Sequence, residues 1–271
     1  MRDASERPIA PVPGAAALAR GDYAAAIREC DESLLNNHEC ADVYCNRAQA
    51  RGALGNLAGA VVDATAAIRL NPHHAWAYRT LGGIHIVQGR LKAALVSCDE
   101  AIRIDPFLAE AYNTRAGARL LLGELHAALV DCNQAIQLGP QLWGAYITRG
   151  NVRYHLHDQS AADDYQTSFE INPAGYVRNM VRLIADQLRR EADSVFANCA
   201  EHLRANPQDT TSYARRGMAL LLLGKDDEAQ EDFDRVVLLR PSSRERLTQL
   251  ITEAKRVRAR RLPVNSDRAV S

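Results

Sequence analysis

Arginine and aspartate side chains recur along the sequence at a spacing that could pair them. One column of positions, 33 or 34 residues apart and interrupted only by Leu81, holds Arg47, Arg115, Arg149, Arg182 and Arg216. Aspartates follow 15 or 16 residues later, at Asp63, Asp131, Asp164 and Asp232. Where Leu81 replaces arginine, Ser97 replaces aspartate, so both charges are lost together. Because a guanidinium fork fits a carboxylate, we predict structural Arg–Asp pairs, with a track for an anionic ligand as the alternative.

Cysteine and histidine residues do not form a metal-binding pattern. Four cysteines share one repeat column and are predicted to be small core residues, namely Cys30, Cys98, Cys132 and Cys199. Cys40 and Cys45 are five residues apart with only His38 nearby, which is not the spacing of a zinc site. His155 and His157 give at most a chance metal site. We therefore expect neither a metal nor a cofactor.

No motif of a catalytic site is present in the sequence. There is no glycine-rich phosphate loop after a predicted strand and no Gly-x-Ser-x-Gly elbow. The paired carboxylates at Asp163-Asp164 and Asp226-Asp227 fall at predicted helix starts or on outer faces, where acidic residues suit the helix dipole. We predict that the protein is not an enzyme and has no catalytic residues.

Composition excludes further classes of function. Of the 271 residues, 47% are apolar and 24% are charged, which is typical of a folded protein. Basic and acidic residues both number 33, so the whole chain is not attracted to nucleic acid by its net charge. No stretch approaches the ~18 apolar residues of a membrane span, and no signal peptide is evident, so we expect a cytoplasmic protein. The preference for arginine over lysine suggests a bacterial coding sequence rich in G and C.

An internal repeat predicts the elements that must position these side chains. Six prolines are spaced by 34, 34, 33, 34 and 34 residues, at Pro72, Pro106, Pro140, Pro173, Pro207 and Pro241. Within one unit, residues 75–88 have helical apolar spacing and end at Gly89, and residues 91–104 form a second helical stretch before Pro106. Two such helices make an antiparallel hairpin, which must stack on its neighbours to bury its apolar face.

The repeat resembles the tetratricopeptide repeat (TPR) family over roughly residues 15–241. The resemblance rests on segments such as Ala111-Tyr112-Asn113-Thr114-Arg115-Ala116 and Ala135-Ile136-Gln137-Leu138-Gly139-Pro140. It implies an all-α fold, a right-handed superhelical solenoid of antiparallel helix hairpins with a concave groove that binds a peptide or another protein.

The predicted organisation has irregular ends around this array. Residues 1–14 form an irregular segment, 242–261 a capping helix with Leu247 and Leu250 on its inner face, and 262–271 a flexible tail. The array itself spans 15–241. A truncated opening repeat at 15–38 precedes six repeats near 41–72, 75–106, 109–140, 143–173, 176–207 and 210–241.

Residues 158–205 are predicted to depart from the regular repeat. The preceding turn lacks one residue and its glycine is replaced by His157, while Arg190 replaces the next turn glycine. Leu183 and His202 stand where other repeats have small residues, and larger side chains there force helices apart. Arg182 meets Asn198 in place of an aspartate, so its charge has no predicted partner.

In TPR superhelices the first helix of each repeat lines the concave side, and this resemblance places a partner-binding groove on those helices. Its apolar character favours an apolar peptide or an amphipathic helix as the ligand, with packing between repeats as the alternative. Tyr154 and Trp76 are the predicted anchors. The predicted groove residues are Trp76, Arg79, Ile86, Val87, Asn113, Leu120, Leu121, Ile147, Asn151, Tyr154 and Met218.

The sequence therefore predicts a non-catalytic scaffold or adaptor that binds a protein or peptide partner. One alternative is a chaperone-like holder of an apolar segment of the partner. Another is a nucleic-acid-associated regulator whose basic residues 255–261 contact RNA, DNA or anionic lipid, although the same residues are typical of a solvated helix end. The identity of the partner and the oligomeric state are not predicted.

Overall fold

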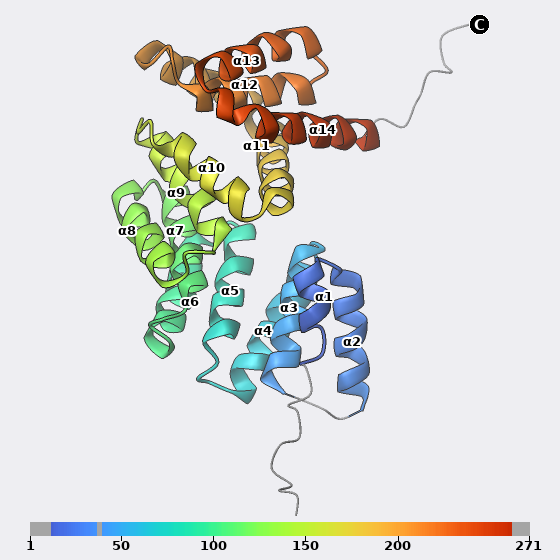
Figure 1. Cartoon of the computed structure of the whole chain (residues 1–271). Helices are drawn as coiled ribbons and strands as arrows, with labels where there is room; N and C mark the ends of the chain where they lie inside the picture. Colours follow the sequence, from blue (N-terminus) through green and yellow to red (C-terminus); the bar gives the residue numbers. More distant parts are fainter. Residues whose placement is uncertain (1–11, 37–39, 262–271) are drawn as a thin grey trace, which may run out of the picture. The chain divides into compact units, whose positions relative to one another are not determined.

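The computed structural model describes residues 12–36 and 40–261. These residues form fourteen α-helices and one short 3-10 helix, with no strand among them. The helices belong to two compact units, Met1–Gly139 and Pro140–Ser271, each of which is described by itself (Figure 1). The prediction of an all-α fold is confirmed. Residues 1–11, His38 with its neighbours, and the tail predicted at 262–271 lie outside the described residues.

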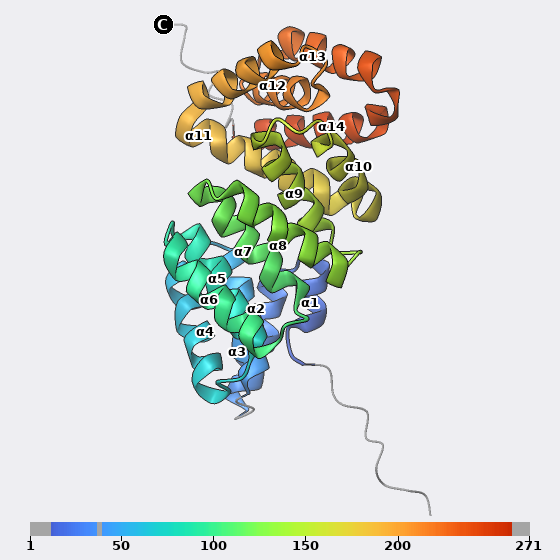
Figure 2. The same ribbon diagram turned by 90° about the vertical axis from the view of Figure 1, so that its left-hand side faces the viewer.

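The first unit is a series of helix hairpins in which each helix packs on the next one along the chain (Figures 1 and 2). The first and second helices of each full repeat alternate from α3 to α8. The helices are α1 (Ala15–Arg20), α2 (Tyr23–Leu35), α3 (Ala41–Ala53), α4 (Leu57–Leu70), α5 (Ala75–Val87), α6 (Leu91–Ile104), α7 (Ala109–Leu122) and α8 (Leu125–Leu138).

Glycine and small residues explain the tight hairpins of this unit. The turn between α5 and α6 contains Gly89 at φ 73°, in the left-handed region that glycine adopts without strain. Inside α5, a Cβ at Gly82 would lie 2.8 Å from the sulfur of Cys98 in α6, so glycine is required for the two helices to approach. The column of Ala60, Ala94 and Ala128 is fully buried. Close contact between paired helices thus follows from residue size.

The second unit contains two further hairpins, one long helix and a terminal helix. Its elements are α9 (Trp143–His155), α10 (Ala161–Ile171), α11 (Pro173–Ala205), α12 (Thr210–Leu222), α13 (Asp226–Leu239), η1 (Pro241–Ser243) and α14 (Arg244–Arg261). The apolar side of α14 is buried on the unit through Leu247 and Leu250, which are 2% and 4% exposed. The burial of these two side chains confirms the predicted inner face of the helix.

The irregular region is visible as a kink within α11. This helix runs through the place where other repeats have a turn, and only Glu191, at φ −151° and ψ 66°, departs from helical geometry. Arg190 stands where the turn glycine is lost, so the repeat predicted at 176–207 has no separate turn. Just before α10, His157 adopts φ 56°, alone among the described non-glycine residues in the left-handed region. Both departures lie where the sequence predicted them.

Candidate functional site

The predicted arginine–aspartate pairs are present in both units. Arg115 Nε and Nη2 donate to the two carboxylate oxygens of Asp131 at 2.9 and 2.7 Å. Arg149 Nη2 lies 2.7 Å from Asp164, a carboxylate that is almost completely buried. The same pairing joins Arg47 to Asp63 and Arg216 to Asp232. Their charges are neutralised within the fold, so these four arginines do not form a track for an anionic ligand.

In three of these four pairs, a second arginine binds the same aspartate. Arg51, Arg119 and Arg153, one helical turn after the first arginines, each donate to the same aspartates at 2.8 Å. The first arginine also lies over a tyrosine ring one turn earlier, as Arg115 does over Tyr112 at 5.5 Å. Hydrogen bonding to Asp63 raises the pKa of Arg47. The cluster of arginine, aspartate and tyrosine side chains therefore connects the two helices of each hairpin.

The repeat formed by α5 and α6 lacks these charges and has a neutral contact between Ser97 and His85 in their place. Ser97 Oγ contacts His85 Nδ1 at 3.4 Å and donates to the carbonyl of Ala93 at 3.0 Å. His85 occupies the position of the second arginine, and its burial lowers its pKa, which favours the neutral ring. The sequence predicted the joint loss of Arg and Asp at Leu81 and Ser97, but it did not reveal that His85 completes this set.

Within the first unit, helices α5 and α7 present an apolar face that contains the predicted groove residues. Trp76, Val87 and Leu121 are 41%, 63% and 60% exposed. Ile86 and Leu120 are half-buried beside them. Trp76 and Val87 are eleven residues apart, about three helical turns, so they project from one side of α5. These five predicted groove residues are therefore available to a partner, in whole or in part.

Two polar groups on the same face have no hydrogen-bond partner among the described residues. Arg79 Nε and Asn113 Oδ1 are both buried and unpaired, and they occupy the same repeat position on α5 and α7. Arg79 makes no ion pair with a described residue, and its guanidinium lies 5.6 Å from the Trp76 ring. Burial lowers the pKa of Arg79. A buried donor or acceptor left unpaired costs about 1–3 kcal/mol. The free protein therefore has two uncompensated polar atoms on this face.

Two helical glycines on this face were missed in the sequence. A Cβ at Gly83 would meet nothing within 4 Å, and one at Gly117 would meet only the Ile86 side chain, at 3.9 Å. Packing inside the protein therefore does not require glycine at either place, although glycine costs a helix about 1 kcal/mol relative to alanine. The signal in the sequence was the adjacent pair Gly82-Gly83, with Gly117 one repeat later.

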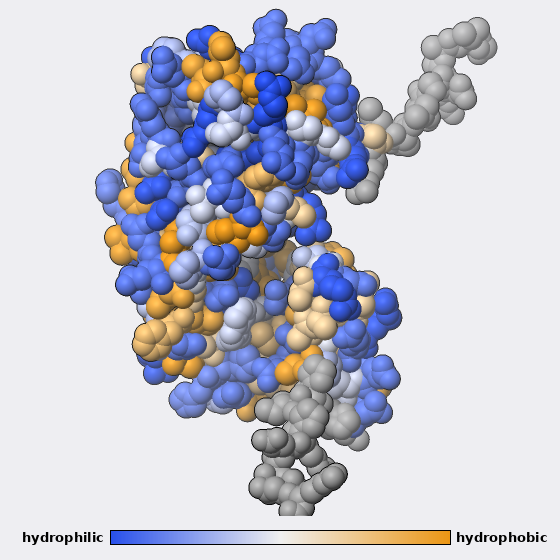
Figure 3. All heavy atoms as spheres, viewed as in Figure 1, coloured by the Kyte–Doolittle hydropathy of each residue, from blue (hydrophilic) through white to orange (hydrophobic). Residues whose placement is uncertain are grey.

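A different apolar column faces outward on the second helices of the first unit. Val62, Val96 and Val130 are 66%, 70% and 66% exposed, one on each of α4, α6 and α8. Figure 3 shows apolar side chains over α6 and α8 at the left of the view. Unlike the α5–α7 face, no unpaired polar group accompanies these valines among the described residues.

The second unit corrects several predicted groove residues. Tyr154, Ile147 and Met218 are 3%, 5% and 1% exposed and belong to the core of the unit, so they cannot present their side chains to a partner. Asn151 is half-buried, and its Oδ1 accepts from Tyr165 and Arg215 at 2.9 Å each. The prediction that Tyr154 anchors a partner is therefore wrong.

The burial of Tyr154 has a specific cause. Its ring stacks on His202 at 3.9 Å, and His157 stacks on the other side of that histidine at 4.1 Å. The Tyr154 hydroxyl donates to Cys199 Sγ at 3.7 Å, and burial raises the pKa of this tyrosine. Large residues at the irregular positions thus fill the space beside α9 and enclose the tyrosine.

The remaining chemistry-bearing residues form no further site. Cys30, Cys98, Cys132 and Cys199 are buried, as predicted, and burial raises the pKa of Cys30 to about 11. Within residues 12–36 and 40–261, no group of three or more His, Cys, Asp or Glu side chains could hold a metal ion. None of the helices in these ranges is long and apolar enough to cross a membrane.

Comparison with known proteins agrees with this architecture. A tetratricopeptide repeat model matches residues 45–109 and a second one matches residues 210–243. No curated protein matches the sequence. The solved structure of TTC0263, a thermophilic TPR protein of Thermus thermophilus, is 21% identical, covers 59% of this chain and 89% of its own, and gives a TM-score of 0.55. The chain is a tetratricopeptide-repeat protein.

A larger solved structure has the same fold. The APC/C hetero-tetramer Cut9-Hcn1 is 13% identical, with 89% of this chain and 48% of that chain covered and a TM-score of 0.58. At this level of identity the likeness concerns the fold alone.

Proposed function

We propose that the protein is a non-catalytic scaffold that binds an extended peptide segment of a partner on the α5–α7 face, and that it acts in the cytoplasm. The observation that carries this proposal is the combination of exposed apolar side chains with unpaired buried polar groups on one face. Trp76, Val87 and Leu121 supply the apolar part, and Arg79 and Asn113 supply the polar part.

Apolar exposure supports binding but does not by itself choose a face. Contiguous exposed apolar side chains often mark an interaction surface, and aromatic residues such as Trp76 dominate interface energetics. The valines of α4, α6 and α8 are equally exposed. The α5–α7 face differs because two unpaired polar atoms, Arg79 Nε and Asn113 Oδ1, lie among its apolar side chains.

A rotamer change that exposes these two buried atoms would let a peptide main chain form hydrogen bonds with them. Arg79 Nε is a donor that suits a carbonyl oxygen, and Asn113 Oδ1 is an acceptor that suits an amide N–H. Gly83 and Gly117 leave open space where side chains would otherwise keep a peptide backbone away. An extended segment with apolar side chains therefore fits this face better than a regular helix, whose own backbone groups are already paired.

The basic end of α14 is a weaker candidate for binding. Arg258 donates to the carboxylate of Asp226 and to the carbonyl of Leu221, and Arg256 lies 3.6 Å from Glu253. Two of the basic side chains are therefore engaged within the second unit. No observation in the described residues favours a nucleic-acid ligand over a solvated helix end.

Site-specific photo-crosslinking tests the proposed face. A photoreactive phenylalanine analogue placed at Val87 or Leu121 should crosslink to a partner in cells, and the same analogue at Val96 or Val130 should not. Both pairs are exposed to a similar extent, so accessibility does not explain a difference. Crosslinks formed only at Val96 and Val130 would place the binding surface on the second helices and refute the proposal.

A further inference from the structure

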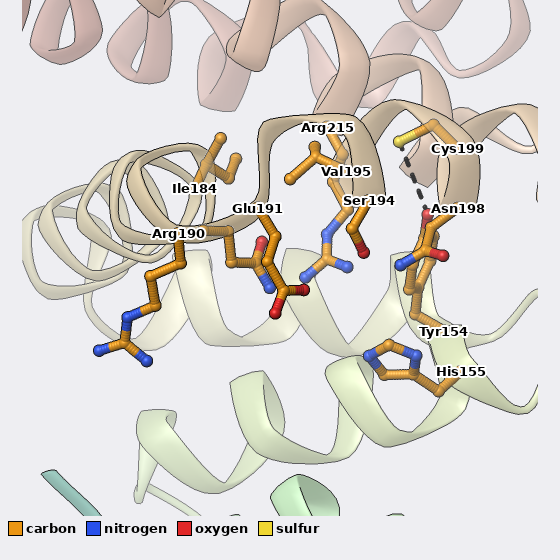
Figure 4. A pocket seen from close by; sticks show the side chains of 11 residues that line it. Tyr154, His155, Ile184, Arg190, Glu191, Ser194, Val195, Asn198, Cys199 and Arg215 are labelled. Atoms are coloured by element: carbon orange, nitrogen blue, oxygen red, sulfur yellow. Dashed lines mark hydrogen bonds between the residues drawn. The ribbon is translucent and has the colours of Figure 1, made fainter. Parts of the chain in front are cut away.

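The second unit contains a cavity beside the kink of α11 (Figure 4). Its volume is about 210 Å³, and residues of α9, α11 and α12 line it. The kink at Glu191 forms one part of the wall, where a regular repeat would have a glycine turn. The loss of that turn therefore coincides with a space that the neighbouring side chains do not fill.

A buried arginine points into this cavity from α12 (Figure 4). Arg215 is 8% exposed, and no carboxylate of the described residues lies within 4.0 Å of its guanidinium. Its Nη2 donates to Asn151 Oδ1 at 2.9 Å, its Cζ lies 4.3 Å from the centre of the Tyr154 ring, and its Nε has no partner among the described residues. A buried charge without a counter-charge is costly, which distinguishes Arg215 from the neighbouring Arg216 and its partner Asp232.

Glu191 lines the same cavity, but no carboxylate of the described residues lies within 4.0 Å of the Arg215 guanidinium. Ser194 and Asn198 of α11 and His155 of α9 face the same space (Figure 4). Partial burial in the cavity and the charge of Arg215 lower the pKa of His155, which favours its neutral form. Glu191 is exposed at the kink and makes no ion pair with a described residue. The cavity therefore holds one buried cation, Arg215, together with neutral hydrogen-bonding groups and the exposed, oppositely charged side chains of Arg190 and Glu191 at its wall.

We propose that this cavity binds a carboxylate group, held by the guanidinium of Arg215 with Ser194 and Asn198 as neutral partners. A planar carboxylate matches the guanidinium fork. Because the charges of Arg190 and Glu191 at the wall offset each other, the net positive charge is that of Arg215, which suits a monoanion better than a phosphate dianion. The carboxylate belongs either to a small free acid or to the chain end of a bound peptide, and both sources present the same atoms to Arg215.

Calorimetry on the full chain tests the proposal with two probes. Sodium acetate represents a free acid, and acetyl-trialanine with a free or an amidated C-terminus represents a chain end. We expect saturable binding of acetate, of the free-acid peptide, or of both, and none of the amide. A stronger signal from the peptide identifies a chain end, and a stronger signal from acetate identifies a free acid. Absence of binding by both carboxylates in millimolar solution would overturn the proposal.

Substitution of Arg215 separates a ligand site from a structural role. Arg215→Met should weaken carboxylate binding about tenfold or more, because a charge-assisted hydrogen bond is lost. It should also leave the melting temperature unchanged or raise it, because a buried charge is removed while Asn151 keeps its bond from Tyr165. A lower melting temperature combined with unchanged binding would show that Arg215 only supports the core.

Two further variants keep the test decisive. Ser194→Met fills the cavity while Arg215 stays in place, and it should abolish binding even where Arg215→Met folds poorly. Glu191→Gln should leave binding unchanged or tighten it, because it removes a like charge. Destabilisation by Glu191→Gln, together with carboxylate binding that occurs only in this variant and not in the wild-type protein, would identify Glu191 as the internal partner of Arg215 and refute the proposal. Arg182→Met, on the exposed side of α11, is the matched control.

Discussion

Arg115 and Asp131 join the two helices of one hairpin through a two-pronged ion pair. Arg115 Nε and Nη2 of α7 lie 2.9 and 2.7 Å from the carboxylate oxygens of Asp131 in α8. Asp131 is only 2% exposed, and Arg119 donates a further hydrogen bond to the same carboxylate. The same arrangement recurs in both units, so the hairpin is fixed by a polar cluster as well as by its apolar contacts.

Removal of one member of this cluster should destabilise the first unit strongly. Asp131→Ser leaves Arg115 and Arg119 without their buried counter-charge, and breaking a buried pair in this way costs about 3–5 kcal/mol. Urea unfolding followed by circular dichroism measures the change. The double variant Arg115→Leu with Asp131→Ser copies Leu81 and Ser97 of the neighbouring repeat and should lose less stability than the single variant. A larger loss in the double variant would contradict the pairing.

Adjacent glycines of α5 should respond to alanine in opposite directions. Gly82→Ala brings a Cβ to 2.8 Å from the sulfur of Cys98 and should lower the free energy of unfolding. Gly83→Ala meets no atom within 4 Å and should raise it by about 0.5–1 kcal/mol, through helix propensity. Each serves as the control of the other in thermal and urea unfolding. Equal destabilisation by both would mean that Gly83 has a packing role.

The kinked segment should exchange its amide hydrogens faster than the regular repeats. Glu191 departs from helical φ and ψ angles within α11, and the cavity beside it leaves fewer packing contacts. Hydrogen exchange followed by mass spectrometry should therefore show earlier labelling across residues 186–196 than across residues 75–138. Uniform protection along both ranges would show that the kink does not weaken the local structure.

Acidification should destabilise the protein through buried histidines. Burial lowers the pKa of His85 and of His202 below the value of an unfolded histidine, about 6.5. The unfolded chain therefore binds more protons than the folded chain as the pH falls through 6.5. The contribution of these neutral histidines to the free energy of unfolding is fully present above that pH and decreases below it. Melting temperatures recorded between pH 7.5 and 5.5 should fall along this series.

Histidine substitutions assign this pH dependence. His85→Gln and His202→Gln should each flatten the decrease in melting temperature, because the group that takes up a proton on unfolding is removed. His126→Gln, on the outer side of α8, should leave the curve unchanged. A flat curve for the wild-type protein in this window would contradict the role of the buried rings.

The spacing of the prolines predicted the helices because each repeat is a local unit. The Arg115–Asp131 pair could be predicted because the repeats align without gaps. The arginine and aspartate columns are therefore separated by a constant number of residues, which places them opposite each other in the hairpin. The same logic predicted the buried cysteine column at Cys98 and Cys132. The position of the kink at Glu191 could be predicted from the lost glycine. Its conformation could not be predicted, because a sequence without this glycine is compatible with either a turn or a bent helix.

The candidate site was less predictable, because exposure depends on neighbours outside the repeat. Tyr154 occupies the same position as Leu120 in the repeat, yet His202 stacks on its ring and buries it. Such a contact between side chains of different repeats leaves no periodic signal. Arg215 stands in a column that holds Thr114 and Thr148 in earlier repeats, and this break in the pattern was the only sign of its isolated charge.

The measurement closest to the central claim compares two valine variants of the first unit in partner binding. Val87 on the α5–α7 face and Val96 on the outer side of α6 are 63% and 70% exposed, so both substitutions to alanine remove the same atoms from similar surroundings. The partner is first identified by affinity capture, and its binding segment is then titrated by calorimetry.

We expect Val87→Ala and Trp76→Ala to weaken binding, the latter by about 2 kcal/mol or roughly thirtyfold, with unchanged melting temperatures. Val96→Ala should bind as the wild type does. Unchanged affinity in the Trp76 and Val87 variants, with a loss in the Val96 variant, would contradict the proposal that the α5–α7 face holds the partner.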